Sequence, residues 1–301
     1  MKVEESKIEG FNIKIVSINN LKIGVATDIG PRILYLARKN RPPKNLFGIY
    51  PKMGMNTIEG FWKVYGGHRF WSAPEGKPRS YSIDDKPVEI NIEKNSVTIY
   101  GNPEKENSIR KEIAIKPFGK DGAQVVHRIQ NIGRWPITLG CWALSLMEKE
   151  GFAVIPIKAS KVDREGLLPD RHLAIWPYTS LEDKRLKLTD EHIFVMKNSK
   201  VEKPIKIGTM ANPRWAAYVV DGMAFVKEFS EMEGDYPDFG CSVEVYTNAD
   251  MLEFETLSPL KTLDPSASME HTEIWKILDT GVLEPKTDDV KNKLEVLLQT
   301  S

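Results

Sequence analysis

The chain has 301 residues with 42 basic and 42 acidic side chains, so its formal net charge is zero. This balance excludes the surplus of lysine and arginine on which binding to nucleic-acid phosphates depends, and no stretch approaches the roughly 18 consecutive apolar residues of a membrane-spanning helix. The charged N-terminus, MKVEESKIEG, has no apolar segment of the kind found in signal peptides. We therefore expect a cytoplasmic protein that contacts neither nucleic acid nor membrane.

Two further features of the composition bear on the environment of the protein. Cys141 and Cys241 lie far apart in apolar segments without CxxC spacing, which predicts buried, reduced thiols rather than a metal site. Charged residues make up 28% of the chain, and it contains only three glutamines. This bias is typical of proteins from thermophiles.

Predicted strands follow one another along the chain, most of them in pairs. Alternating apolar and polar residues flank turn signals at 19–20, 94–96, 118–122, 221–222 and 248–250, and each such pattern predicts a β-hairpin. The run PITLGCWALSLM (136–147) is apolar on both faces, as in a buried strand, and ASMEHTEIWKIL (267–278) predicts a last strand. Residues 151–213 have a weaker pattern and predict strands joined by long loops.

Helical patterns are rare, and the clearest is at the C-terminus. Asp288 or Asp289 can cap a helix that places Val290, Leu294 and Leu297 on one face. The sequence therefore predicts an all-β fold, a large antiparallel sandwich with few short helices and a C-terminal helix. We expect residues 1–301 to form a single domain.

The segment YGGHRFWSAPEG (65–76) contains the first group of candidate site residues. Its glycines and prolines argue against a helix, and its polarity argues against a core strand. His68 is able to exchange protons near neutral pH, Arg69 to orient hydroxyl or carboxylate groups, and Trp71 to stack on a sugar. Gly66 and Gly67 would let the backbone approach a ligand. The alternative is a loop histidine bonded to the backbone beside a surface arginine.

The strand MLEFETLSP (251–259) contains the second group. Alternation places Glu253 and Glu255 on one face, roughly 7 Å apart. If both are buried, the pKa of one is raised, which makes it a usable general acid or base. The alternative is a pair of solvated glutamates on an edge strand.

Weaker candidates are polar residues in apolar or turn-rich surroundings. We predict that five of them bind substrate, each with a structural alternative such as an ion pair or an exposed strand position: Arg32, Glu75, Lys227, Asp238 and Glu244. His127 is expected to be a satisfied, half-buried histidine. His271, Glu273 and Trp275 share one strand face, which we expect to lie at the surface or rim.

Several nucleotide-binding, serine-hydrolase and metal-binding motifs are absent from the sequence: GxGxxG after a strand, a P-loop, GxSxG and HExxH. No spacing of histidines and carboxylates predicts a metal site. We therefore expect neither a cofactor nor a metal.

Four segments resemble the galactose mutarotase-like supersandwich proteins, which include the aldose 1-epimerases. They are GPRILYL, GGHRFW, HRIQNIGRWPITLGCWAL and EVYTNADMLEFETLSPLKTLDPSASMEHTEIWKI, and together they span most of residues 10–278. The resemblance implies that Glu255, or else Glu253, takes the proton of the anomeric hydroxyl while His68 protonates the ring oxygen. The ring then opens and recloses with C1 inverted, without a metal or cofactor.

The sequence departs from this family at one position. Aldose epimerases have a second histidine near CWALSLM, where this chain has Trp142 and Ser145. The acid role would then pass to Arg69 or Lys227, the substrate would be a different sugar derivative, or the protein would bind sugar without a reaction.

The leading hypothesis is an isomerase that binds a small carbohydrate, an aldose or sugar-phosphate 1-epimerase. The alternatives are a non-catalytic carbohydrate-binding protein on the same fold and a sugar lyase or hydrolase. The last requires carboxylates on two sides of a bond, and Glu253 and Glu255 lie on one strand.

Overall fold

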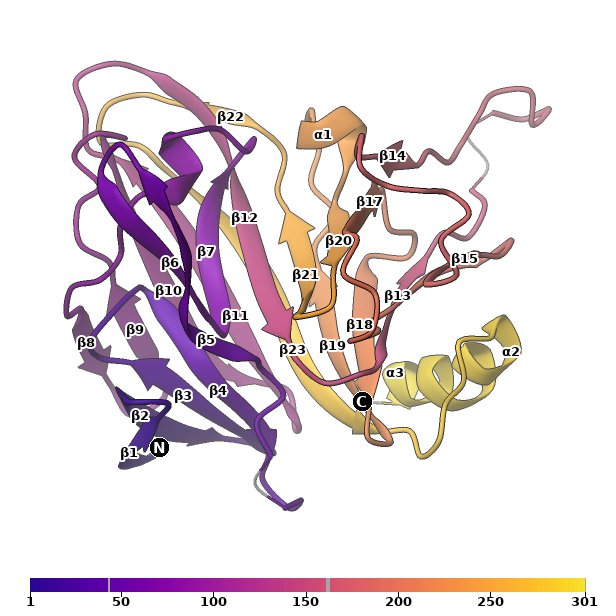
Figure 1. Cartoon of the computed structure of the whole chain (residues 1–301), viewed down its shortest axis with the longest axis horizontal. Coiled ribbons are helices and arrows are strands. Elements are labelled where there is room, and N and C mark those ends of the chain that lie inside the picture. The colour runs from indigo at the N-terminus through magenta and orange to yellow at the C-terminus, as the bar shows by residue number, and fades with distance from the viewer. Residues whose placement is uncertain (43, 161–162, 301) are drawn as a thin grey trace.

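Two antiparallel β-sheets, stacked face to face, make up most of the chain (Figure 1). The structure, a computed structural model, describes residues 1–42, 44–160 and 163–300. In sheet I the strands lie in the order β1 (Lys2–Ile8), β2 (Phe11–Ile18), β3 (Leu21–Ala26), β4 (Arg32–Arg38), β7 (His68–Ala73), β12 (Ile137–Met147), β21 (Leu252–Leu257), β20 (Val243–Thr247), β17 (Ile205–Thr209) and β14 (Ala174–Ile175), with β22 (Lys261–Leu263) paired to β12.

Sheet II has the order β15 (Leu186–Leu188), β16 (His192–Met196), β13 (Phe152–Pro156), β18 (Trp215–Val220), β19 (Met223–Phe229), β23 (Ser268–Asp279), β11 (Gly122–Asn131), β10 (Ile109–Phe118), β9 (Val97–Tyr100) and β8 (Glu89–Ile92). A separate hairpin is formed by β5 (Ile49–Thr57) and β6 (Gly60–Gly66). The short helices are η1 (Arg79–Tyr81) and α1 (Pro237–Gly240), and the tail helix consists of α2 (Thr287–Asp289), η2 (Val290–Glu295) and α3 (Val296–Thr300). Among the described residues, no helix has the length and apolar character needed to cross a membrane.

The predicted all-β fold is confirmed, and so are the five predicted hairpins. Each turn signal joins two paired strands: β2 to β3, β8 to β9, β10 to β11, β18 to β19 and β20 to β21. The tail helix is also confirmed, since Val290 and Leu294 pack in a cluster with side chains from the outer face of sheet II. The predicted cap is wrong, because the N-cap residue is Lys286 and both Asp288 and Asp289 lie inside the helix. Local turn chemistry and strand alternation were therefore sufficient to predict these elements.

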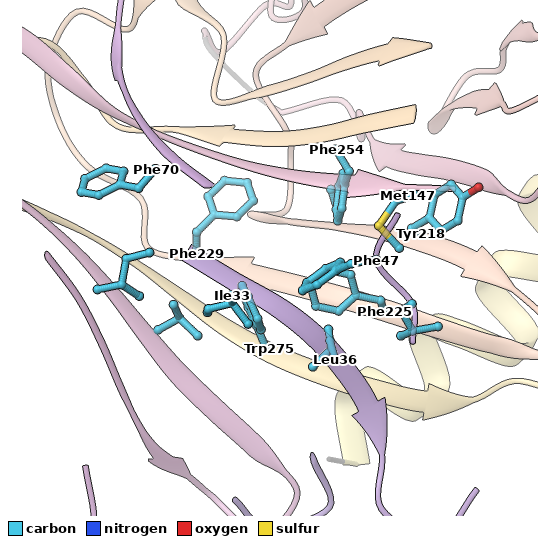
Figure 2. Packing of buried hydrophobic residues seen from close by; sticks show 14 of the residues in the cluster. Ile33, Leu36, Phe47, Phe70, Met147, Tyr218, Phe225, Phe229, Phe254 and Trp275 are labelled. Carbon is cyan, nitrogen blue, oxygen red and sulfur yellow. The ribbon is translucent and has the colours of Figure 1, made fainter. Parts of the chain in front are cut away.

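The main core lies between the two sheets. Alternate residues of each strand point inward, because side chains in a strand alternate between its faces. Figure 2 shows Phe47, Phe225, Phe254 and Trp275 within this cluster, and the rings of Phe225 and Trp275 have centroids 5.3 Å apart.

A second apolar cluster lies on the outer face of sheet I, which is the face turned away from sheet II. Trp62 and Val64 of β6 pack there against Trp71, Trp142 and other residues of β7, β12 and β21. The β5–β6 hairpin therefore covers part of this face, beside the strands that carry the candidate glutamates.

Two consecutive glycines make the sharp connection from β6 to β7. Both have positive φ, +91° at Gly66 and +71° at Gly67. A Cβ at Gly67 would lie 2.3 Å from the carbonyl oxygen of Ile33, and one at Gly66 would lie 2.1 Å from that of Gly48. We predicted that these glycines let the backbone approach a ligand. In the structure they instead lie close to other parts of the protein's own backbone, the carbonyls of Ile33 and Gly48.

Replacing Gly67 by alanine is expected to destabilise the protein by about 2–5 kcal/mol, because a left-handed conformation and a backbone clash add together. Gly166→Ala is the matched control, since Gly166 has the same φ of +71° and no atom of the described residues lies within 4 Å of its Cβ position. Only the conformational cost of about 1–2 kcal/mol applies to the control. Urea unfolding measures both, and equal losses in the two variants would contradict the packing argument.

Candidate functional site

Strand alternation divides the predicted site residues between the two faces of sheet I. On β7, His68 and Phe70 point inward and Arg69 and Trp71 point outward, since Phe70 belongs to the main core and Trp71 to the outer cluster. On β21, Glu253 and Glu255 point outward in the same way, because Phe254 between them is a core residue. Arg69, Trp71 and the two glutamates therefore share one face, and His68 lies on the other.

A pocket of about 390 Å³ lies on the outer face of sheet I. Most of its wall is aromatic or sulfur-containing, and its charged groups are Arg69, Lys206, Glu253 and Glu75 at the rim. The other lining residues are Met53, Trp62, Val64, Trp71, Tyr81, Trp142, Tyr178, Pro204, Tyr246, Asn248 and Met251. Flat apolar walls with a few fixed polar groups are what small-ligand sites have in common.

Arg69 and Glu253 form an ion pair in the wall of this pocket. The Nη2 atom of Arg69 donates to Oε1 of Glu253 at 2.7 Å. The guanidinium carbon lies 4.1 Å from the ring centre of Trp71, so the cation is stacked as well as paired. Nε and Nη1 of Arg69 are buried and have no hydrogen-bond partner in the described part of the chain.

The pKa of Glu253 is raised above its ordinary value. Burial is the largest cause, and Glu255 on the same strand adds to it, while Arg69 acts in the opposite direction. A carboxylate with a raised pKa is a stronger base at neutral pH than a solvated glutamate. Glu253 therefore combines access to the pocket with the basicity of a proton acceptor.

A second charged cluster lies beside the first, formed by Lys206, Glu244 and Glu255. The Nζ atom of Lys206 is 2.7 Å from Oε2 of Glu244 and 3.0 Å from Oε2 of Glu255. The indole N–H of Trp142 also donates to Oε2 of Glu255, at 2.8 Å. All three charged side chains are buried, and of these only Lys206 is among the residues that line the pocket.

His68 occupies a different place from the one expected beside the glutamates. It is fully buried between the sheets, where its Nδ1 lies 2.8 Å from Oγ of Ser145 and its Nε2 lies 2.7 Å from Nε2 of His127. Nδ1 of His127 in turn hydrogen-bonds to the carbonyl of His271 at 3.1 Å. The segment is a strand rather than the expected loop, and these partners satisfy its polar side chain inside the core.

Lys227 and Glu273 continue this buried network. Their ion pair measures 3.0 Å, and Lys227 also donates to two backbone carbonyls. Thr256 and Trp275 donate to the two oxygens of Glu273, at 2.5 and 2.6 Å. The expected surface position of β23 is thus wrong for Glu273, which is buried together with His271 and Trp275.

The network contains one group with the composition of a metal site. Ligand atoms of His68, His127 and Glu273 all lie within 4.8 Å of one another. A metal ion there would face the ammonium group of Lys227, and both oxygens of Glu273 already accept hydrogen bonds. The arrangement is that of a hydrogen-bonded core network joining the two sheets.

The histidines of this network are expected to be neutral at pH 7 and to take up protons only at a lower pH than a solvated imidazole does. Burial, with Lys227 nearby, holds the pKa of His68 and that of His127 below the ordinary value, and burial lowers the pKa of His271 to about 3. An unfolded histidine titrates near pH 6.5. Because the unfolded chain binds more protons below that pH, these residues contribute stability that is lost as the pH falls. Imidazole signals in a pH series of NMR spectra test this, and titration of the three rings near pH 6.5 would contradict it.

The remaining predicted substrate-binding residues are dispersed. Arg32 donates to the carbonyls of Val64 and Gly66 and to Asp84, so it braces the β6–β7 connection. Asp238 lies in the α1 turn at φ +53° and is outside the pocket lining, as is Lys227. Glu75 lies at the pocket rim, where it accepts a hydrogen bond from the hydroxyl of Tyr81.

Sequence reasoning missed Lys206, Trp142 and Tyr246 as site residues. Lys206 lies between Ile205 and Ile207, and a single charge inside an apolar strand was the signal used for Glu244. In the register, Lys206 is opposite Tyr246, and Tyr246 is opposite Glu253. The pairing of β17, β20 and β21 therefore aligns the three across the sheet.

Comparisons with known proteins concern the fold. No protein-family model matches the chain, and no curated protein matches it by sequence. A galactose mutarotase-like protein from Lactobacillus casei superposes with a TM-score of 0.58 at 9% identity, over 88% of this chain and 100% of the other. The YeaD protein of Salmonella typhimurium, described as a candidate mutarotase, gives 0.58 at 8% identity, over 92% of this chain and 94% of the other.

A third solved structure is longer than this chain. It is a TPR-domain-containing protein from Parabacteroides distasonis, with a TM-score of 0.61 at 11% identity over 92% of this chain. The match covers 49% of that protein, so the chain spans about half its length. Taken with the sheet order and the sequence motifs, these likenesses show that the chain has the galactose mutarotase-like fold.

Proposed function

We propose that the outer-face pocket binds a small aldose and interconverts its two anomers, so that the protein is an aldose 1-epimerase with Glu253 as the base. The observation that carries the proposal is a carboxylate of raised pKa, fixed by Arg69, in the wall of an aromatic pocket. The galactose mutarotase-like fold raises the prior for this chemistry without deciding it.

The pocket suits a carbohydrate because it combines flat rings with fixed hydrogen-bonding groups. Trp62, Trp71, Trp142 and three tyrosines present apolar surface to the C–H faces of a sugar ring. Glu253 and Lys206 supply charged groups in the wall that can hydrogen-bond to sugar hydroxyls. These groups would orient a sugar with its anomeric hydroxyl toward Glu253, which then removes that proton.

The charges in the pocket favour an uncharged aldose over a sugar phosphate. Arg69 is already paired with Glu253, and Lys206 is already paired with Glu244 and Glu255. A phosphate would have to compete with these carboxylates at short range and would be repelled by them. Of the two substrate classes considered from the sequence, the neutral sugar is therefore the one we propose.

One observation favours a second candidate, a carbohydrate-binding protein without a reaction. None of the pocket-lining residues in the described part of the chain is a histidine, whereas the acid proposed from the sequence is His68. This candidate shares the pocket and its aromatic walls and differs only in the chemical step.

Proton NMR exchange spectroscopy separates the two candidates. Purified protein is mixed with neutral aldoses, their phosphates and the corresponding uronates, and the exchange between anomers is compared with that in buffer. We expect faster exchange for at least one neutral aldose and little effect on the phosphates. Saturable sugar binding without faster exchange would support the binding protein, and neither binding nor exchange would overturn both.

A further inference from the structure

Anomer exchange needs an acid as well as a base, because the ring oxygen must gain a proton when the ring opens. Among the described residues, the five histidines include none that lines the pocket. The cation besides Arg69 that lines the pocket is Lys206. A guanidinium does not give up its proton in proteins, so Lys206 is the group to consider.

Lys206 is placed to serve both the pocket and the two buried glutamates. Its ammonium group has three hydrogens; one is donated to Oε2 of Glu255 at 3.0 Å, and Oε2 of Glu244 lies 2.7 Å away as an ion-pair partner. The group lies between the rings of Trp142 and Trp176, at 4.8 and 4.7 Å from their centres. Lys206 also lines the pocket, so its ammonium group is the cation beside Arg69 that a ligand there would meet.

The two glutamates behind Lys206 face each other across the sheet and are ion-paired to the same ammonium group. Glu244 and Glu255 are directly opposite each other in the register of β20 and β21, where facing Cβ atoms are about 4.5–5.5 Å apart. Oε1 of Glu255 and both oxygens of Glu244 are buried without a hydrogen-bond partner. Two carboxylates and one lysine carry a net negative charge inside the protein, and one added proton neutralises the cluster.

We propose that Lys206 is the proton donor to the ring oxygen of the sugar and that Glu244 stores the proton that replaces the one it gives away. This inference rests on the proposed epimerase function and assigns the acid that the function lacks. Glu255, which also accepts a hydrogen bond from the Trp142 indole, fixes Lys206 in position.

The proton balance of ring opening follows from this arrangement. Glu253 takes the proton from the hydroxyl on C1, and the bond between C1 and the ring oxygen breaks with its electron pair on oxygen. Lys206 gives a proton to that oxygen and receives one from the carboxyl group of Glu244. The products are an open-chain aldehyde, protonated Glu253, ionised Glu244 and an unchanged ammonium group, and the reverse steps at the other face of the aldehyde give the other anomer.

The directions of the pKa shifts agree with these roles. Burial raises the pKa of Glu244 well above that of a solvated glutamate, with Lys206 opposing and Glu255 adding to the effect. Burial alone would lower the pKa of Lys206, but the two ionised glutamates raise it far above its ordinary value. A proton on Glu244 removes one of these negative charges and so makes Lys206 a stronger acid. Other ionisable groups that act on Glu244 or Lys206, or face them from neighbouring strands, are Asp238, Cys241, Tyr178, Tyr246, Glu253 and Arg69.

The test uses Glu244→Gln and Lys206→Arg in the full chain, with the exposed Glu89→Gln as control. We expect kcat for anomer exchange to fall by about 10- to 100-fold in Glu244→Gln and by about 100-fold in Lys206→Arg, with KM changed less than twofold. The basic limb of the kcat–pH profile should move to higher pH in Glu244→Gln. In the wild type the limb reflects loss of the proton stored on Glu244, whereas in the variant it reflects loss of a proton from Lys206. A purely structural role would not move that limb.

The outcomes separate this inference from the proposed function. Absence of exchange by the wild-type protein on every sugar overturns the function and the inference together. Exchange that survives both substitutions with an unmoved basic limb overturns the inference alone. A carbon-13 spectrum of glutamate-labelled protein gives a second readout: a carboxyl protonated at pH 7 is expected, it should vanish in Glu244→Gln, and its absence from the wild type would also overturn the inference.

Discussion

Glu253→Gln is expected to slow catalysed anomer exchange by about 10²- to 10⁴-fold, the range that a positioned general base contributes. The glutamine keeps an oxygen that accepts from Arg69 but cannot take a proton from the sugar. Sugar affinity should change little, since the aromatic walls and Lys206 remain. Exchange spectroscopy gives the rate and a sugar titration gives the affinity.

The wild-type pH profile adds a second check on the same residue. Glu253 must be ionised to act as a base, and its pKa is raised by burial, so the acid limb of kcat/KM should lie above pH 4.5. Glu89→Gln, on β8 of sheet II, is the control and should keep the wild-type rate. Wild-type exchange by Glu253→Gln would show that another group is the base.

The largest effect on stability is expected from Glu273→Gln. This change leaves the ammonium group of Lys227 without its counter-ion in a fully buried site. Breaking one partner of a buried ion pair typically costs about 3–5 kcal/mol. Lys227 holds the pKa of Glu273 well below its ordinary value, although burial opposes this. The native carboxyl group is therefore ionised, and Glu273→Gln removes a full negative charge. Denaturant unfolding measures the change.

Two further variants define the cause of that loss. Glu270→Gln, on the same strand but exposed, is expected to stay within about 0.5 kcal/mol of wild type. The double change Lys227→Met with Glu273→Leu removes both charges and should recover much of the stability. A loss below about 1 kcal/mol in Glu273→Gln would show that the ion pair does not hold this part of the core.

The sequence was sufficient to predict the fold and the part of the pocket wall that contains Glu253 and Arg69. Hairpin signals and alternation located most of the paired strands, and the pattern MLEFETL placed Glu253 and Glu255 on one face. The same rule applied to HRFW separates His68 from Arg69, but the segment was interpreted as a loop because it is polar. Its polarity was misleading, since Ser145 and His127 satisfy His68 inside the core.

The rest of the pocket wall depended on strand order. Lys206 is far in sequence from Glu255 and joins it only because β17, β20 and β21 are neighbours in sheet I. Nothing in local periodicity specifies which strands become neighbours, so the partner of a charged residue in an apolar strand stays undetermined. The same holds for Lys227, whose partner Glu273 lies on the adjacent strand β23.

The most direct test of the central claim, that sugar binds on the outer face of sheet I, is a titration of the indole N–H signals with an aldose. The chain has seven tryptophans, of which Trp62, Trp71 and Trp142 line the pocket. Trp275 lies beside the histidine network and Trp215 packs in the cluster beneath the tail helix. We predict saturable shifts of the three pocket signals while Trp275 and Trp215 stay in place. A sugar that shifts the Trp275 signal and leaves the three pocket signals unmoved would contradict the account. It would indicate that the sugar binds near His68 instead.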